Sequence, residues 1–152
     1  MKKFWPIALM FLCLAVVSSC GKDDDEVVVD EVWKLQNEEA FQAIASDPAY
    51  KELKSLGNDG SVYYQVMKEG TGKREIYYTD SVKVYYTGRY YTGEVFDSAE
   101  PPYDYPATFA LQAGLTNSAI EGWPVAVQYM HVGDRWNIWM PYQLAYGEQG
   151  LK

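Results

Sequence analysis

Residues 82–147 limit most strongly what this chain can fold into, because short alternating segments, glycine turns and aromatic rings follow one another throughout them. Apolar and polar side chains alternate over residues 82–88, and a tight turn follows at Thr92-Gly93. We interpret residues 95–98 as a hinge. The same period of two begins earlier, from Ser61 onward. Such alternation is typical of half-buried β-strands. We therefore expect antiparallel strands joined by short turns.

One amphipathic helix is expected among these strands. Residues 120–130 have helical spacing, with Pro124 tolerated in the first turn. Its apolar side chains fall close to one face, and they are Ile120, Trp123, Val127 and Met130. Short strands are expected on either side of it, at residues 108–111 and 136–140. Strands wrapped around one such helix make an α+β domain, which we place at residues 58–152.

A helical appendage is predicted before this domain, over residues 31–57. Residues 31–45 have helical spacing, with an apolar stripe that includes Trp33 and Phe41. Asp47-Pro48 has the form of a cap followed by a first-turn proline, so a second short helix is expected after it. The apolar face of that second helix would carry Tyr50, Leu53 and Leu56. Two copies of the chain could dimerise through this appendage.

The first nineteen residues have the features of a lipoprotein signal peptide. Lys2 and Lys3 precede an almost wholly apolar run over residues 4–17, which is shorter than the ~20 residues that a membrane span needs. Val17-Ser18-Ser19-Cys20 resembles a bacterial lipobox, in which Cys20 becomes the lipidated first residue. The alternative is an ordinary secretory leader in which Cys20 is incidental. We expect a lipid anchor that holds the protein on a membrane without spanning it.

An acidic segment follows the anchor and is expected to act as a solvated tether over residues 20–30. It also resembles the acidic signal of some Gram-negative surface lipoproteins, so an outer-membrane location, facing the periplasm or the cell surface, is expected. Over the whole chain, 13 Lys and Arg stand against 21 Asp and Glu, a net charge of −8. Such a chain repels phosphate backbones, which argues against nucleic acid as a partner. The other cysteine, Cys13, lies in the leader, so no intrachain disulfide is expected in the mature protein.

Aromatic rings that recur beside glycines mark the candidate site. The residues singled out are Tyr86, Phe96, Asp97, Trp123 and Tyr146. Rings with one carboxylate suit a site that shields and twists a ligand better than one that attacks it, and no cofactor or metal is expected. Each residue also has a simpler interpretation, since the rings could be core and Asp97 could cap a turn. His131, in a turn after the helix, is expected at the surface rather than as a ligand.

Five blocks of the chain resemble the FKBP-type peptidyl-prolyl cis-trans isomerases in order and spacing. They are Val84-x-Tyr86-Thr87-Gly88, Phe96-Asp97-Ser98, Ile120-x-Gly122-Trp123, Met130-x-x-Gly133 and Leu144-Ala145-Tyr146-Gly147. Residues 106–109, Pro-Ala-Thr-Phe, are similar to the exported bacterial branch of that family. The resemblance covers residues 81–150. It implies an FKBP-like bent antiparallel sheet half-wrapped around a short helix, with the proline of the substrate between them.

The resemblance also implies a role for each residue of the site. Trp123 is the expected floor of the pocket, and its expected walls are Tyr86, Phe96, Phe109 and Tyr146. Ile120, next to Ala119, is expected to offer its backbone N–H to the substrate, and Asp97 to lie at the rim. Asp97, Tyr146 and Tyr86 are the expected catalytic groups. Ala107 stands where some members have an aromatic residue, which thins one wall.

Members of the family usually continue beyond the point where this sequence ends, with a flap loop and a final strand inside the sheet. From the resemblance we therefore expect residues 58–152 to be an incomplete domain. Without that strand, two ladders would be unpaired and a sheet face would be uncovered. The side chains expected on that face are Val84, Tyr86, Ile138 and Met140.

The resemblance implies an isomerase that acts on proline-containing polypeptides, assists the folding of envelope proteins and binds the macrolide inhibitors of the family. Two other functions are compatible with the residues. One is a non-catalytic chaperone or peptide-binding module on the same fold. The other is a carbohydrate-binding lipoprotein whose glycan face would contain Tyr90, Tyr91, Tyr103 and Tyr105.

Overall fold

The structure, a computed structural model, describes residues 31–57 and 60–148. The elements are α1 (Glu31–Ala45), β1 (Lys51–Lys54), β2 (Ser61–Lys68), β3 (Ser81–Val84), β4 (Tyr86–Arg89), β5 (Val95–Ala99), β6 (Ala107–Ala110), α2 (Gly122–Val127), β7 (Arg135–Trp139) and the 3-10 helix η1 (Tyr142–Leu144). The expected signal peptide, Cys20 and the acidic tether lie outside the described residues.

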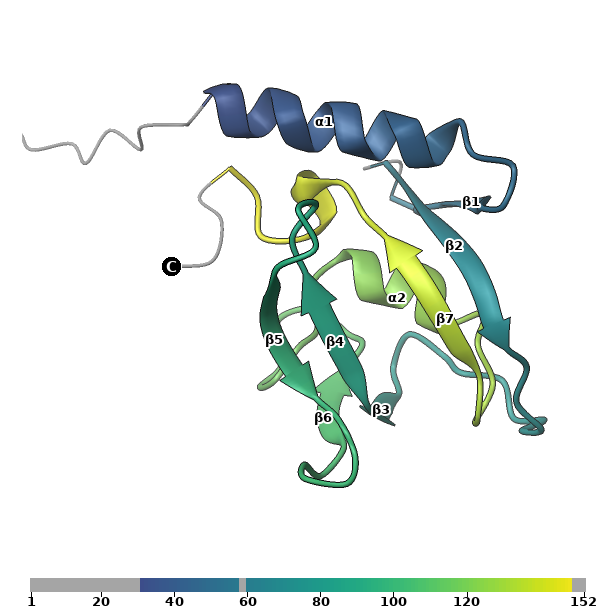
Figure 1. Cartoon of the computed structure of the whole chain (residues 1–152). Helices are drawn as coiled ribbons and strands as arrows, with labels where there is room; N and C mark the ends of the chain where they lie inside the picture. Colours follow the sequence, from purple (N-terminus) through teal and green to yellow (C-terminus); the bar gives the residue numbers. More distant parts are fainter. Residues whose placement is uncertain (1–30, 58–59, 149–152) are drawn as a thin grey trace, which may run out of the picture.

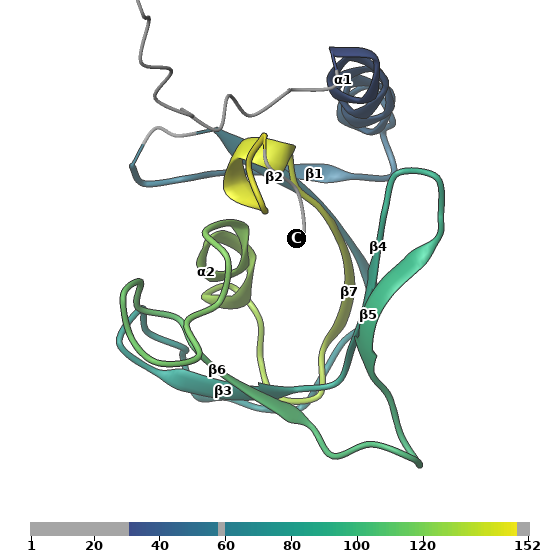
Figure 2. The same cartoon turned by 90° about the vertical axis from the view of Figure 1, so that its left-hand side faces the viewer.

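All strand pairing among these elements is antiparallel, and it forms three small sheets rather than the single bent sheet that we expected. One sheet has the order β1-β2-β7, a second pairs β3 with β6, and a third pairs β4 with β5. Figure 2 shows β2 and β7 on one side and β3 and β6 below, so that together the strands curve around α2. The α+β class and the short helix enclosed by strands are as predicted.

The hydrophobic core lies between α2 and the three-stranded sheet. Its fully buried members are Val62 of β2, Ala126 of α2 and Leu144 of η1, and half-buried Leu53, Val125, Ile138 and Met140 pack against them. Small residues let α2 approach closely, because a Cβ added at Gly122 would lie 2.8 Å from the Sδ atom of Met140. Packing at this density favours one fixed position for the helix.

Helix α1 has the predicted bounds and lies across β2, the β4–β5 turn and η1 (Figure 1). The Phe41 ring meets Tyr63 of β2 edge-on at 5.4 Å between centroids, and Trp33 meets Tyr142 at 5.9 Å. The Tyr91 hydroxyl donates to Gln36 Oε1 at 2.6 Å. No residue of α1 is fully buried, so the helix rests on the sheet rather than inside the core.

The second short helix predicted after Asp47-Pro48 is wrong, because that segment forms a turn and then strand β1. The Asp47 side chain accepts a hydrogen bond from the Ala49 N–H at 2.8 Å, and its carbonyl accepts one from the Tyr50 N–H at 3.1 Å. In β1, Leu53 lies opposite Val62 and packs against the core. Pairing with β2 therefore overrides the weak helical preference of this short segment.

Three other predicted elements differ in their extent. The alternating segment over residues 82–88 is broken at Tyr85 into β3 and β4, which pair with different strands. Residues 95–98, interpreted as a hinge, belong to strand β5, whose pairing with β4 shifts register between Val95 and Asp97. The expected helix over residues 120–130 is regular only over Gly122–Val127, and turns follow it.

The sheet face that was expected to be uncovered is half-buried. Val84, Tyr86, Ile138 and Met140 are all of intermediate exposure. Strand β7 pairs with β2, while β3 and β4 pair with β6 and β5, and no ladder joins β7 to β3 or β4 among the described residues. Within the same residues, no helix has the length and hydropathy required to cross a bilayer.

Candidate active site

The predicted site residues come from the ends of several elements that surround one side of α2. Tyr86 is the first residue of β4, Phe96 and Asp97 lie in β5, and Phe109 lies in β6. Trp123 lies in the first turn of α2, and Tyr146 follows η1. Tyr86 and Phe109 face α2, because both of their rings contact Trp123.

Three of the rings form one contact group. The Tyr86 ring meets Trp123 edge-on at 5.5 Å between centroids and Phe109 at 5.7 Å. Phe109 and Trp123 are tilted against each other at 5.0 Å. All three are half-buried. The structure thus brings the expected floor and two expected walls into mutual contact.

A second group of rings lies along β5. Phe96 meets Tyr146 edge-on at 5.8 Å between ring centroids, and the Phe96 and Tyr90 rings are tilted against each other at 4.9 Å. Gly88 of β4 makes room for this group, because a Cβ there would lie 2.6 Å from the Phe96 ring. Edge-on pairs in which ring centroids lie within 4.5–7 Å are favourable beyond the area they bury.

Asp97 links the two groups. The Tyr86 hydroxyl donates a short hydrogen bond to Asp97 Oδ2. Asp97 is exposed, and the Tyr146 side chain is 39% exposed, so this edge of the cluster is open to solvent. A ligand could therefore enter past the carboxylate and reach the rings behind it.

Both tyrosines keep their protons well into the alkaline range. Burial, and then the hydrogen bond to Asp97, raise the pKa of Tyr86 to about 12. Burial, followed by the charge of Asp97, also raises the pKa of Tyr146. Removing a phenol from water, or placing it beside a carboxylate, disfavours the phenolate. At neutral pH both hydroxyls are donors.

The hydroxyl groups of Tyr86 and Tyr146 differ in their hydrogen bonding. The Tyr86 hydroxyl is held by Asp97, whereas the part of the chain that the structure describes contains no hydrogen-bond partner for the Tyr146 hydroxyl. Tyr146 therefore presents a free donor at the open edge of the cluster. A carbonyl oxygen of a bound peptide is a suitable acceptor for it.

Ala119 and Ile120 lie in the segment just before α2, and neither takes part in the ring contacts described above. The Ala119 N–H donates to the Ala110 carbonyl at 2.9 Å, and the Ile120 carbonyl accepts from the Trp123 N–H at 3.0 Å. Both side chains are half-buried. The Ile120 N–H, expected to bind substrate, has no partner among residues 31–57 and 60–148.

Sequence reasoning missed Tyr90 and Gly88 as members of the cluster. Tyr90 was considered only as part of a glycan-binding face, with Tyr91, Tyr103 and Tyr105. The structure does not gather those four, because Tyr90 packs on Phe96 and Tyr91 bonds to α1, while Tyr103 and Tyr105 lie beyond the other end of β5. The repeated Tyr-Tyr-Thr-Gly around the hairpin was the available signal for Tyr90 and Gly88.

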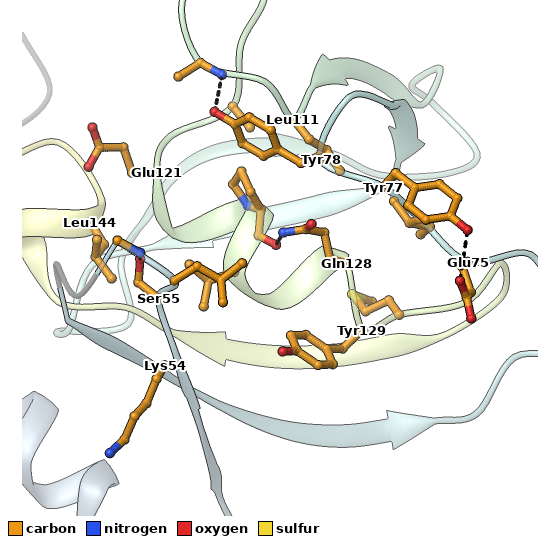
Figure 3. A pocket seen from close by; sticks show the side chains of 18 of the residues that line it. Lys54, Ser55, Glu75, Tyr77, Tyr78, Leu111, Glu121, Gln128, Tyr129 and Leu144 are labelled. Atoms are coloured by element: carbon orange, nitrogen blue, oxygen red, sulfur yellow. Dashed lines mark hydrogen bonds between the residues drawn. The ribbon is translucent and has the colours of Figure 1, made fainter.

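A separate pocket of about 760 Å³ lies beside α2, and Figure 3 shows the side chains that line it. None of the rings of the aromatic cluster is among them. The pocket is bounded by α2, by the end of β1 and by the segment that contains Tyr77 and Tyr78. Ala119 lines this pocket, and the exposed His131 stands in the turn at its edge, as expected for a surface histidine. Among the described residues, no group of three or more His, Cys, Asp or Glu side chains is arranged to hold a metal ion.

Comparisons with known proteins relate the chain to one family. Residues 72–152 match the family described as FKBP-type peptidyl-prolyl cis-trans isomerase. The chain is 40% identical over 130 residues to "FKBP-type peptidyl-prolyl cis-trans isomerase FkpA" of Aeromonas hydrophila, covering 86% of this chain and 43% of that protein. It is 38% identical over 88 residues to "Outer membrane protein MIP" of Legionella longbeachae, covering 58% of this chain and 35% of that protein.

A solved structure is also similar. The crystal structure of a peptidyl-prolyl cis-trans isomerase from Pseudomonas syringae superposes with a TM-score of 0.63 at 28% identity, over 80% of each chain. The chain spans less than half the length of either curated relative. The family match covers more than half of this chain and includes every residue of the aromatic cluster. The chain therefore belongs to the FKBP-type peptidyl-prolyl cis-trans isomerase family.

Proposed function

We propose that the aromatic cluster catalyses cis-trans isomerisation of X–Pro bonds in polypeptides. The observation that carries this proposal is the mutual contact of the Trp123, Tyr86 and Phe109 rings, with Asp97 and the partly exposed Tyr146 at the solvent-exposed edge of the cluster. In this proposal the rings border an apolar recess that holds the proline ring of the substrate, while the edge of the cluster contacts the carbonyl groups on either side. Membership of the family supports the same activity.

The proposed isomerisation requires only non-covalent binding of the substrate. Rotation about an X–Pro bond is slow because it breaks amide resonance, with a barrier of about 18–20 kcal/mol. A twisted amide is less polar than a planar one, so a dry aromatic recess stabilises it relative to the ground state. A millionfold acceleration requires about 8 kcal/mol of such differential stabilisation. No covalent step enters this mechanism.

The side chains take distinct roles in this proposal. Trp123 is the floor under the proline, and the wall rings are Tyr86, Phe96, Phe109 and Tyr146. The Tyr146 hydroxyl and the Ile120 N–H, beside Ala119, donate to the carbonyls of the substrate. Asp97 holds the Tyr86 hydroxyl and thereby orients the ring that faces Trp123. Macrolide inhibitors of the family would occupy the same recess.

We further propose that the protein works at the outer membrane of a Gram-negative bacterium, where it assists the folding of envelope proteins. The lysine start and apolar run before Cys20 support a lipid anchor there, with residues 20–30 as the tether. The name of the Legionella relative is consistent with this location. In this proposal α1 is an appendage to the domain at residues 58–152, and pairing of two α1 helices is a route to a homodimer.

The activity can be tested with a tetrapeptide that contains one Leu-Pro bond. The protein should accelerate the cis-to-trans conversion in proportion to its concentration, and a macrolide inhibitor should abolish the acceleration. A protein that binds the peptide at the cluster without accelerating the conversion would be a non-catalytic binding module on this fold. That result would contradict the proposal.

A further inference from the structure

Helix α1 contacts two turns of the candidate active site that are distant in the sequence. One of them, residues 142–148, contains Tyr146, and we term it the Tyr146 turn. The other, residues 90–94, joins β4 to β5. Figure 1 shows α1 lying across both turns. The isomerisation itself uses no residue of α1, so these contacts need a separate explanation.

The Tyr146 turn is closed by its own backbone. The Tyr142 carbonyl accepts hydrogen bonds from the N–H groups of Ala145 at 3.1 Å and Gly147 at 2.8 Å. Gly147 has a φ of 65°, a left-handed conformation that glycine adopts without steric cost. The two donors flank Tyr146, so the position of Tyr142 fixes the backbone on both sides of the Tyr146 ring.

Two neighbouring residues of α1 hold this turn at both of its ends. At its start, the Trp33 ring meets the Tyr142 ring edge-on at 5.9 Å between centroids. The Lys34 ammonium lies over the same Tyr142 ring, 5.8 Å from its centroid, and a cation within about 6 Å is attracted by the ring face. At the other end of the turn, this ammonium donates to Glu148 Oε1 at 2.9 Å. Lys34 thus bridges the first and the last residue of the Tyr146 turn.

The bridge made by Lys34 fixes geometry more than it adds stability. The Lys34 side chain is only 28% exposed, so its stem is covered, whereas the Glu148 side chain is 48% exposed. Ion pairs at the surface contribute little to the free energy of unfolding, because water screens them and both side chains lose freedom. The Phe41–Tyr63 contact holds α1 on the domain independently of this pair.

A further residue of α1 contacts the other side of the same ring group. Gln36 Oε1 accepts a hydrogen bond from the Tyr91 hydroxyl at 2.6 Å. Tyr91 directly follows Tyr90 in the β4–β5 turn. Phe96 packs between the rings of Tyr90 and Tyr146. Helix α1 is therefore attached to both of the turns that carry the outer rings of this group.

We propose that Lys34 is a positioning residue for the isomerisation, because it holds both ends of the Tyr146 turn and thereby keeps the Tyr146 hydroxyl at the edge of the aromatic cluster. Gln36 anchors α1 to the β4–β5 turn and so fixes the helix relative to the rings. This inference rests on the proposed function for the role of the Tyr146 hydroxyl. A donor that is displaced by about 1 Å loses much of its effect on the transition state.

The first test measures kcat/KM of the full chain for a Leu-Pro tetrapeptide. Lys34→Met keeps the apolar stem but removes the ammonium, and it should lower kcat/KM about threefold through misplacement of the donor. Lys34→Arg keeps the positive charge and should retain wild-type activity. The matched control is Lys51→Met, at an exposed lysine of β1, which should also leave the activity unchanged. Wild-type activity in Lys34→Met would overturn the proposal.

The second test asks whether Lys34 acts through Tyr146. In Tyr146→Phe the donor is already absent, so adding Lys34→Met should cause no further loss of kcat/KM, as expected for two residues that act as one unit. A merely structural role of Lys34 would instead lower the activity of both backgrounds by the same factor. Losses that multiply in this way would contradict the proposal.

Failure of the isomerase proposal is distinguishable from failure of this one. If wild type does not accelerate the conversion, the proposed function is wrong, and NMR of protein with isotope-labelled tyrosine then tests the positioning alone. The ring signals of Tyr146, assigned by their loss in Tyr146→Phe, should shift in Lys34→Met and stay in place in Lys51→Met. Tyr146 signals that do not move in Lys34→Met would overturn the positioning role.

Discussion

Tyr146 combines ring packing against Phe96 with a hydroxyl that no described residue engages. Its ring can be kept while its donor is removed. The Tyr86 hydroxyl already donates a hydrogen bond to Asp97, so its first role is to hold the site together rather than to bind a ligand. At the scale of single residues, the account therefore assigns substrate bonding to Tyr146 and orientation to the Tyr86–Asp97 pair.

Replacing Tyr146 by Phe should lower kcat/KM for a Leu-Pro tetrapeptide by about two- to tenfold, because one hydrogen bond contributes about 0.5–1.5 kcal/mol. The ring contact with Phe96 remains, so the thermal unfolding midpoint should not change. Tyr103→Phe removes an exposed hydroxyl outside the cluster and serves as the control. Full activity in Tyr146→Phe would show that the hydroxyl does not bond the substrate.

The raised pKa of Tyr86 predicts how stability depends on alkaline pH. The folded state retains this proton up to a pKa of about 12, whereas the unfolded chain releases it near 10, so the folded state binds more protons between these values. The stabilisation is complete below pH 10 and is lost as the pH rises toward 12. Urea unfolding at several pH values should show wild type losing stability relative to Tyr86→Phe over that window. A difference that stays constant from pH 9 to 12 would contradict the assignment.

At the scale of elements, the hairpin of β4 and β5 holds the second ring group through a close approach at Gly88. Replacing Gly88 by Ala would place a methyl group 2.6 Å from the Phe96 ring, so the ring or the strand must move. We expect a loss of about 1–3 kcal/mol in the free energy of unfolding, with lower isomerase activity. Urea denaturation measures this loss of stability, and Ser98→Ala on the exposed side of β5 is the control. A Gly88→Ala protein as stable as the control would mean that the hairpin tolerates the displacement.

The elements also show which parts of the fold the sequence could predict. Helix α1 has the bounds expected from its apolar stripe, because a fifteen-residue amphipathic pattern carries its own signal. Strand β1 could not be predicted, since four residues become a strand only by pairing with β2. The break at Tyr85 could not be predicted either, because it depends on the pairing of β3 and β4 with different strands.

The aromatic rings of the candidate site could be predicted from the sequence, whereas the hydrogen bonds between its side chains were harder to predict. The motif blocks placed Tyr86, Phe109 and Trp123 together, and the structure brings them into contact. That Asp97 bonds the Tyr86 hydroxyl depends on the register in which Gly88 lies opposite Asp97. The separate pocket beside α2 had no sequence signal, because its lining comes from β1, the Tyr77 segment and α2, which are distant in the chain.

At the scale of the whole molecule, the proposed lipid anchor would hold the protein at a membrane. Cys20 should be the first mature residue and should carry lipid. Growth with a labelled fatty acid should mark the wild-type protein and leave Cys20→Ala unlabelled, with the label extracted into detergent together with the membrane fraction. Equal labelling of both proteins would mean that the leader is an ordinary secretory one.

The central claim is that an X–Pro bond rotates against the aromatic cluster. Exchange NMR on a labelled Leu-Pro tetrapeptide measures its cis-trans conversion directly, and spectra of the labelled protein show where the peptide binds. We predict exchange far faster than in free peptide, together with shifts of the Trp123 indole and the Tyr146 ring that Asp97→Ala weakens. Exchange no faster than in free peptide, or shifts confined to residues outside the cluster, would contradict the account.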